Sequence, residues 1–360
     1  MRHLNLNLVT IASLSLVVSA CGSSGSSYSM LASGQSFKQS TVNSKIDLLW
    51  VIDNSGSMQP LQNNMTANFN NFMSNFVSKG YDFHLGVTTT DAYRALPQFA
   101  NDPTLAKFRD GVGATHSGVF TILPSTMDLT GTFLINASQG AAGSGDENAF
   151  SSFKAALDSP LNADFLRSNS FLAVVILSDE DDFSDPNRPE FSWTFSGGVA
   201  DHSYSNPGLE TVDSYVNYLD AKTVTTGAFR RYSVSALTVP DTACRNAHVG
   251  QSPSTIIGTR YMDMATKTSG VIGSVCDQSY ASALTEIQKK IIELGTQFYL
   301  TGSPVVSSIA VVVNGTSIPQ DSINGWTYNS AANSIVFHGG AIPPAGASIG
   351  VTFDPTSLTF

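Results

Sequence analysis

The stretch Trp50–Pro60, WVIDNSGSMQP, ends an apolar run and places three oxygen-bearing side chains at alternate positions just before a helix-like pattern. The apolar run, Ile46–Ile52, is nearly continuous, as expected for a strand buried on both faces of a parallel sheet. Apolar residues then recur at spacings of three and four, which predicts a helix over Met58–Ser78. These residues are Leu61, Met65, Phe69, Phe72 and Phe76. The stretch therefore predicts a turn from a buried strand into an amphipathic helix.

The same alternation of strand and helix patterns continues along the chain. Further strands are predicted at DFHLGVTT (82–89), FLAVVILS (171–178), RYSVSALTV (231–239) and GVIGSV (270–275). Further helices are predicted over Ala149–Leu157, Glu210–Lys222, Ile256–Thr268 and Tyr280–Leu294. A polar, glycine-rich insertion, Asp91–Gly145, interrupts the pattern. We therefore expect an α/β fold with a doubly wound, mostly parallel sheet and helices on both faces, which binds ligands at the carboxyl ends of its strands.

The hydrophobic pattern changes near residue 303, after a linker at about Thr301–Pro304. The segment SSIAVVVNGTSI contains an Asn314–Gly315 pair, which is typical of a tight β-hairpin. Short strand patterns separated by Gly, Pro and Asn follow it. Residues 303–360 are therefore predicted to form a small, β-sandwich-like all-β module.

The N-terminus has the features of an export signal. Arg2 and His3 precede a short apolar stretch, Leu8–Val18, which is too short to span a bilayer but fits the apolar region of a secretory signal. The stretch leads into VSAC, which resembles the lipobox of bacterial lipoproteins, where the cysteine is acylated and becomes the new N-terminus. On this resemblance, residues 1–20 are a lipoprotein signal peptide and Cys21 carries the lipid. The alternative is an ordinary signal peptide with an incidental cysteine.

The segment after Cys21 is rich in Gly and Ser and has no period, so residues 21–44 are predicted to be a flexible tether. Gly22, rather than Asp, follows the cysteine. In lipoproteins of Gram-negative bacteria that difference implies the outer membrane. We therefore expect a lipid-anchored protein of the cell envelope.

Composition and charge exclude several classes of function. The net charge is −10, and the 18 Lys and Arg residues are scattered, so neither nucleic acid nor an anionic membrane surface is an expected partner. Any contact with a membrane is expected through the lipid anchor only. No nucleophile elbow, P-loop, His-Glu-x-x-His or paired-cysteine zinc motif occurs, and the six histidines are isolated. The sequence therefore does not predict an enzyme.

The remaining cysteines, Cys244 and Cys276, form an even pair in an exported chain, which favours a disulfide. Such a bond would close a loop of about 30 residues and contribute roughly 3 to 4 kcal/mol in the loop-entropy model. Two free buried thiols are the alternative.

The quoted stretch itself predicts a cation site. Asp53 ends the strand, and Ser55 and Ser57 follow in the turn into the helix, so the three side chains offer hard oxygen ligands suited to Mg²⁺, Mn²⁺ or Ca²⁺. The motif resembles the DxSxS motif of von Willebrand factor A (VWA) domains and their metal-ion-dependent adhesion site. In the alternative interpretation, the serines only cap the helix and Asp53 only ends the strand.

The same resemblance implies two more ligands from separate loops. Asp179, just beyond the strand AVVILS, fits the position of the family's second aspartate. The family's Thr position does not match: the loop here reads GSGDENAF, so Glu147 or Asp146 occupies it. VTTTDA could instead contribute Thr90 or Asp91; the alternative is that these residues simply cap the strand end. An extra carboxylate should tighten cation binding and lower the demand for an acidic group from a partner.

The acidic run Asp179–Asp185 lacks the Gly and the distant Glu of an EF-hand, so most of it is expected to be a solvated loop. The resemblance to a bacterial lipoprotein branch of the VWA family covers about Ile46–Leu294, within a predicted domain at 45–300. It implies that the domain binds a divalent cation together with a protein or glycan partner, in adhesion or protein–protein interaction. The alternative is an envelope scaffold in which the cation only stabilises the fold.

Overall fold

A computed structural model describes residues 37–39, 45–186, 204–205, 207–225, 230–248 and 255–356. The predicted signal peptide, Cys21 and most of the predicted tether lie outside the described residues. Within the described residues, no helix has the length and apolar character needed to cross a membrane.

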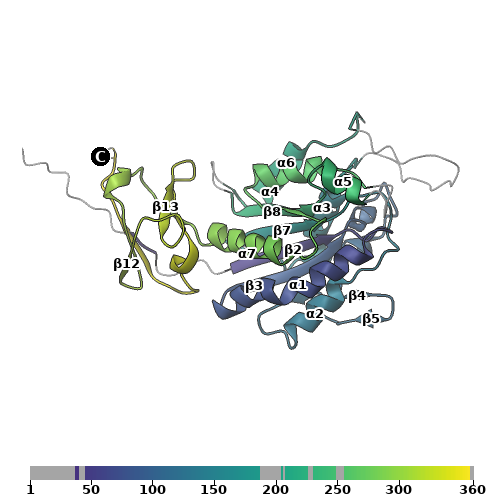
Figure 1. Cartoon of the computed structure of the whole chain (residues 1–360), viewed down its shortest axis with the longest axis horizontal. Helices are drawn as coiled ribbons and strands as arrows, with labels where there is room; N and C mark the ends of the chain where they lie inside the picture. Colours follow the sequence, from purple (N-terminus) through teal and green to yellow (C-terminus); the bar gives the residue numbers. More distant parts are fainter. Residues whose placement is uncertain are drawn as a thin grey trace, which may run out of the picture. The chain divides into compact units, whose positions relative to one another are not determined.

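The central element is a six-stranded sheet with the strand order β6-β3-β2-β7-β8-β9 (Figure 1). Its strands are β2 (Lys45–Ile52), β3 (Asp82–Thr89), β6 (Thr121–Ile122), β7 (Phe171–Leu177), β8 (Tyr232–Thr238) and β9 (Ile272–Ser274). All pairs are parallel except that β6 runs antiparallel to β3. The predicted α/β fold with a mostly parallel sheet is confirmed.

The register aligns the carboxyl ends of the three central strands. Ile52 of β2 pairs with Thr89 of β3 on one side and with Leu177 of β7 on the other. The chain leaves β2 first toward β3 and later returns on its other side as β7. In open α/β sheets, such a reversal of strand order marks the ligand-binding crevice beyond the carboxyl ends of the strands.

The sheet is covered on both faces, and β2 contributes to both cores. Leu48, Trp50 and Ile52 face a core shared with α1, α2 and α7, whereas Leu49 and Val51 face a core shared with α3, α4 and α6. Figure 1 shows α1 and α2 on one side of the strands and α4 and α6 on the other. The helices are α1 (Gln59–Ser78), α2 (Leu129–Ala137), α3 (Ala149–Asp158), α4 (Val212–Lys222), α5 (Thr242–His248), α6 (Thr259–Lys267) and α7 (Ala281–Gly295).

The insertion Asp91–Gly145 contains more structure than its polar composition predicted. It forms α2 and β6, the hairpin of β4 (Gly111–Val112) and β5 (Thr115–His116), and two short 3₁₀ turns at 92–95 and 103–106. Helix α2 is held by Phe133, whose ring stacks on Phe69 of α1 in the core. Ala137 of the same helix is buried in this core, and Leu129 and Leu134 pack against it. Helix α5 was also not predicted.

The C-terminal region forms two small antiparallel sheets. Their strands are β1 (Phe37–Gln39), β10 (Phe298–Tyr299), β11 (Ala310–Val313), β12 (Thr316–Ile318), β13 (Trp326–Asn329), β14 (Ser334–Phe337) and β15 (Ile349–Thr352), with 3₁₀ turns at 306–308 and 339–341. The predicted hairpin at Asn314 and Gly315 is confirmed, since both residues have positive φ (50° and 82°) between β11 and β12. Strand β1 pairs with β15 and lies in the stretch that was predicted to be a tether.

Contacts between the α/β part and the C-terminal strands lie at the amino end of the large sheet. The Tyr81 hydroxyl, just before β3, donates to the Pro343 carbonyl at 3.1 Å, and the Ala345 N–H donates to the Lys79 carbonyl at 3.3 Å. These contacts lie at the end of the sheet opposite the carboxyl ends of its strands.

Cys244 of α5 and Cys276 form a disulfide with a Cα–Cα distance of 5.6 Å, in agreement with the predicted pairing. We expect the unreduced, freshly exported protein to gain no mass on treatment with a thiol alkylating agent, and to gain two adducts after unfolding and reduction. Two alkylated thiols in the unreduced, folded protein would contradict the pairing.

Candidate functional site

Asp53 occupies the crevice between β2 and β7. Its backbone N–H donates to the Leu177 carbonyl at 2.9 Å, which continues the pairing of the two strands, and its side chain is fully buried. One carboxylate oxygen accepts from the Ser55 N–H at 2.8 Å, and the other accepts from the Ser178 hydroxyl at 2.7 Å. The contact of Ser178 with Asp53 could not be predicted from the sequence, because a serine at a strand end is not distinctive by itself.

The two serines of the DxSxS motif do not cap α1. The Ser57 hydroxyl donates to Asp179 Oδ1 at 2.9 Å, across 122 positions of the sequence. The Ser55 hydroxyl is buried beside the Asp53 carboxylate, whose pKa it lowers, and no other group among the described residues bonds to it. The turn after β2 and the turn after β7 therefore meet as predicted, and Ser55 has an oxygen available for a further ligand.

Glu147 lies at the start of α3 and is completely buried. No N–H or hydroxyl group of the described residues donates to its carboxylate oxygens, and its hydrogen-bonding neighbour is a second buried acid, Glu180. Burial, and then the negative charges of Asp53 and Glu180, raise the pKa of Glu147 well above its usual value. The neighbouring Asp146 instead accepts a hydrogen bond from the Tyr93 hydroxyl at 3.2 Å. Of the two candidate acids in this loop, Glu147 is therefore the one that lies with Asp53.

Thr90 and Asp91 hold loops together. The Thr90 hydroxyl is 3.4 Å from Asn54 Oδ1, and Asp91 accepts from Asn54 Nδ2 at 3.1 Å. Asp91 also accepts from the Ser144 N–H at 3.3 Å. These contacts agree with a structural role at the strand end, and none of them is with Glu147.

No Lys or Arg among the described residues balances the charges of the site, although the charge of His248 opposes the rise in the pKa of Asp179. Burial and the charge of Asp179 raise the pKa of Asp53 to about 7, although hydrogen bonds from Ser55 and Ser178 oppose the rise. Burial likewise raises the pKa of Asp179. No Lys or Arg among the described residues forms an ion pair with Asp53, Asp179 or Glu147. Buried carboxylates are costly unless they are protonated or neutralised by a cation.

The donor set fits a hard divalent cation. Asp53 lies within electrostatic range of both Asp179 and Glu147, and Ser57 bonds to Asp179. The oxygens of Ser55 and Glu147, which accept from no donor among the described residues, are the groups that a bound ion would satisfy. Oxygen-only donor sets suit Mg²⁺, Mn²⁺ and Ca²⁺. In the described ranges, no group of three or more His, Cys, Asp or Glu side chains is arranged to hold a metal ion.

The acidic run after β7 is not the solvated loop that the sequence predicted. Its acids are all buried, namely Asp179, Glu180, Asp181, Asp182 and Asp185. Asp182 accepts from the Phe150 N–H at 2.9 Å, at the start of α3, and Asp181 accepts from the Arg260 N–H at 3.0 Å, at the start of α6. Helix N-termini supply unpaired N–H groups and a positive potential, which stabilises these carboxylates.

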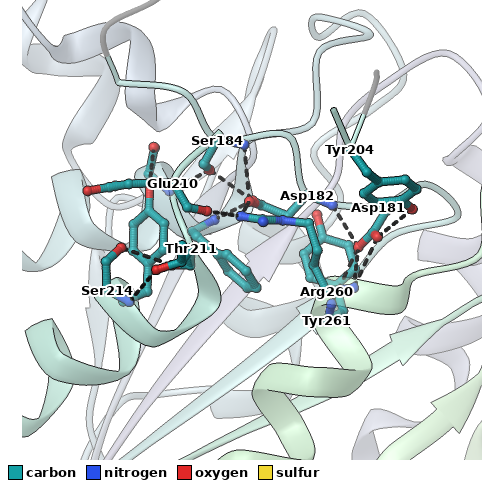
Figure 2. A network of polar contacts seen from close by, with 12 residues as sticks. Asp181, Asp182, Ser184, Tyr204, Glu210, Thr211, Ser214, Arg260 and Tyr261 are labelled. Carbon is teal, nitrogen blue, oxygen red and sulfur yellow. Dashed lines mark hydrogen bonds and ion pairs between the residues drawn. The ribbon is translucent and has the colours of Figure 1, made fainter. Parts of the chain in front are cut away.

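Arg260 compensates much of this buried charge. Its guanidinium donates to Asp182 at 3.2 Å and to the Glu210 carbonyl at 2.6 Å. Figure 2 shows Tyr204 and Arg260 converging on Asp181, to which the Tyr204 hydroxyl donates at 2.8 Å. Arg260 lies nearly 80 positions along the chain from these acids, so no local pattern could have identified it.

Comparison with solved structures finds distant structural similarities. No protein-family model matches the sequence, and no curated protein matches it. Proximal thread matrix protein 1 from the mussel byssus matches with 13% sequence identity and a TM-score of 0.38. The match covers 74% of this chain and 51% of the mussel protein, so this chain spans about half its length. A similarity this distant has no bearing on function.

Proposed function

We propose that this chain is an envelope lipoprotein with a VWA-like domain, and that its crevice binds one divalent cation. The proposed ligands are Asp53, Ser55, Ser57, Glu147 and Asp179. The observation that carries the proposal is the buried Glu147 carboxylate, which accepts from no N–H or hydroxyl of the described residues and lies beside the buried carboxyls of Asp53 and Glu180. The cation would neutralise these charges and hold the three loops of the crevice together.

The proposed role of the bound cation is to mediate adhesion or contact with a protein or glycan partner. Ser57 is partly exposed, so this is the side from which a partner would approach the ion. Because three carboxylates of the protein would surround the ion, a partner need not supply an acidic group.

Since the proposed role of the ion is to mediate the contact, partner capture from an envelope extract should require the cation. Capture that is unchanged when a chelator has removed the cation would contradict this role.

The alternative function is an envelope scaffold whose cation only stabilises the fold. One observation favours it: Asp53, Ser55, Glu147 and Asp179 are all buried, which limits access to an ion held between them. The two functions differ under chelation. Loss of partner capture with a persisting thermal transition supports adhesion, whereas loss of the fold itself supports the scaffold.

The metal-free protein should become less stable as the pH rises. A carboxyl whose pKa is raised in the folded state binds more protons when folded, so its contribution to stability is lost as the pH rises through that pKa. Asp53, with a pKa of about 7, and Glu147 both act in this direction. With a chelator present, the melting temperature should fall between about pH 5 and about pH 8, and saturating Mg²⁺ should reduce or reverse the fall. A chelated protein that became more stable over this range would contradict the assigned charges.

Anchoring is tested at Cys21, which lies outside the described residues. Replacing Cys21 with serine should move the protein from the membrane fraction to the soluble fraction, because a lipidated cysteine is the proposed anchor. The matched control is Ser23→Ala, which leaves the acylated position intact and should keep the protein in the membrane fraction. Membrane retention of the Cys21→Ser protein would contradict the lipoprotein assignment.

A further inference from the structure

Gln62, in the first turn of α1, joins two loops of the crevice. Its side chain is buried, and its Nε2 donates to the Asp53 carbonyl at 2.9 Å and to the Gly140 carbonyl at 2.8 Å. Its Oε1 accepts from the Gly140 N–H at 3.1 Å. One uncharged side chain thus fixes the turn of the DxSxS motif to the segment that leads to Glu147.

Asn54 makes a second connection between the same two loops. Its backbone carbonyl accepts from the Gly143 N–H at 2.7 Å, and its side chain reaches Asp91, which also binds the Ser144 N–H. The approach is close: a Cβ at Gly143 would lie 2.4 Å from Asn54 Cγ. The segment 140–144 is therefore held at several points before the chain reaches Glu147.

These contacts do not depend on a bound ion, because every partner is a protein group. They set the distance between Asp53 and Glu147 in the metal-free protein, although the two carboxylates repel each other. A site held in this way is preorganised, so that binding an ion need not order the loop.

On the basis of the cation site proposed above, we propose that Gln62 is a positioning residue that sets both the affinity of the site and its preference among divalent ions. Mg²⁺ requires near-ideal octahedral geometry at short distances, whereas Ca²⁺ accepts longer and less regular coordination. A loop held firmly against Asp53 can meet the stricter requirement. Loosening it should therefore weaken Mg²⁺ binding more than Ca²⁺ binding.

The first test is Gln62→Met, which keeps the length of the side chain but removes all three hydrogen bonds. Titration calorimetry should give a roughly tenfold loss of Mg²⁺ affinity, typical for loss of an outer-shell partner, and a loss of Ca²⁺ affinity of about threefold or less. The matched control is Gln59→Ala, because Gln59 lies in the same turn but is exposed and bonds only to Asn63 among the contacts described. Equal losses for the two ions, or no loss, would overturn the proposal.

A double-mutant cycle then tests whether Gln62 acts through Glu147. In a Glu147→Gln background the added effect of Gln62→Met on Mg²⁺ affinity should shrink to about twofold or less, since the group being positioned has lost its charge. An undiminished tenfold effect would mean that Gln62 supports the site by some other route, and would contradict the proposal. Asn54→Ala, which loosens the same segment from the other side, provides a second variant if Gln62→Met does not fold.

A measurement without metal completes the test. In the metal-free protein, Gln62→Met should speed hydrogen exchange at the Gly140 amide by at least about tenfold, while exchange in β7 stays unchanged. Unchanged exchange at Gly140 would overturn the positioning role. If the unsubstituted protein bound neither ion, the proposed function would fail as well, and that result is distinct from binding that Gln62→Met leaves intact.

Discussion

Asp53→Ala is expected to lower the affinity for the divalent cation by roughly 100-fold, or about 2.7 kcal/mol. Asp53 is the carboxylate that connects the proposed ligands, since hydrogen bonds from Ser55 and Ser178 fix its orientation, the charge of Asp179 acts on it, and its own charge acts on Glu147. Titration calorimetry of the purified variant measures the loss. Affinity within about threefold of the unsubstituted protein would remove Asp53 from the proposed site.

A second buried carboxylate, in the strand β2 that precedes Asp53, provides the matched control. Asp47 is also completely buried, but it lies at the amino end of β2 and pairs with Arg167 at 2.7 Å. Asp47→Asn should lower the stability of the fold, because it breaks a buried ion pair, and should leave cation affinity unchanged. Asp53→Asn should do the reverse: it removes a repulsive buried charge, so the metal-free protein should become more stable while cation affinity falls.

Glu147→Thr is the second prediction with a large effect. It restores the residue type that the VWA resemblance implies at this position, and it removes one of the three carboxylates. Cation affinity should fall by at least the ten- to hundredfold that loss of an outer-shell partner costs. Contact with a carboxylate-bearing partner through the ion should instead become stronger, because the ion would be less completely neutralised by the protein.

A fall in cation affinity together with stronger partner binding distinguishes a ligand role of Glu147 from a general loss of structure. Calorimetry with the cation alone and partner binding at a saturating cation concentration measure the two effects. Asp146→Asn is the control, since Asp146 is the neighbouring acid but contacts Tyr93. Unchanged cation affinity in Glu147→Thr would remove Glu147 from the ligand set without affecting the other four residues.

The parallel core of the fold could be predicted from local patterns. Strand β2 and helix α1 were expected within one residue of their observed bounds, because a buried strand and an amphipathic helix have distinct hydrophobic periods. The insertion could not be predicted in the same way. Its helix α2 is fixed by Phe133 stacking on Phe69, a contact between residues far apart in sequence.

The candidate site was predictable only in part, for a related reason. The DxSxS turn and Asp179 stand at strand ends, so the topology of a doubly wound sheet brings them together. The burial of the acidic run depends on Arg260 and on the N-termini of two helices, none of which is adjacent to it in the sequence. The helical period alone does not distinguish Gln62 from the other polar residues of α1, and only the tertiary structure shows that it binds the loop before Glu147.

The most direct test of the central claim is titration calorimetry of the unsubstituted mature protein with Mg²⁺, Mn²⁺ and Ca²⁺ in separate experiments. We expect at least one of them to bind saturably with one ion per chain, at or below about millimolar concentration, and to raise the melting temperature by mass action. Absence of a binding signal for all three ions at millimolar concentration, together with an unchanged melting temperature, would contradict the proposed cation site and the function built on it.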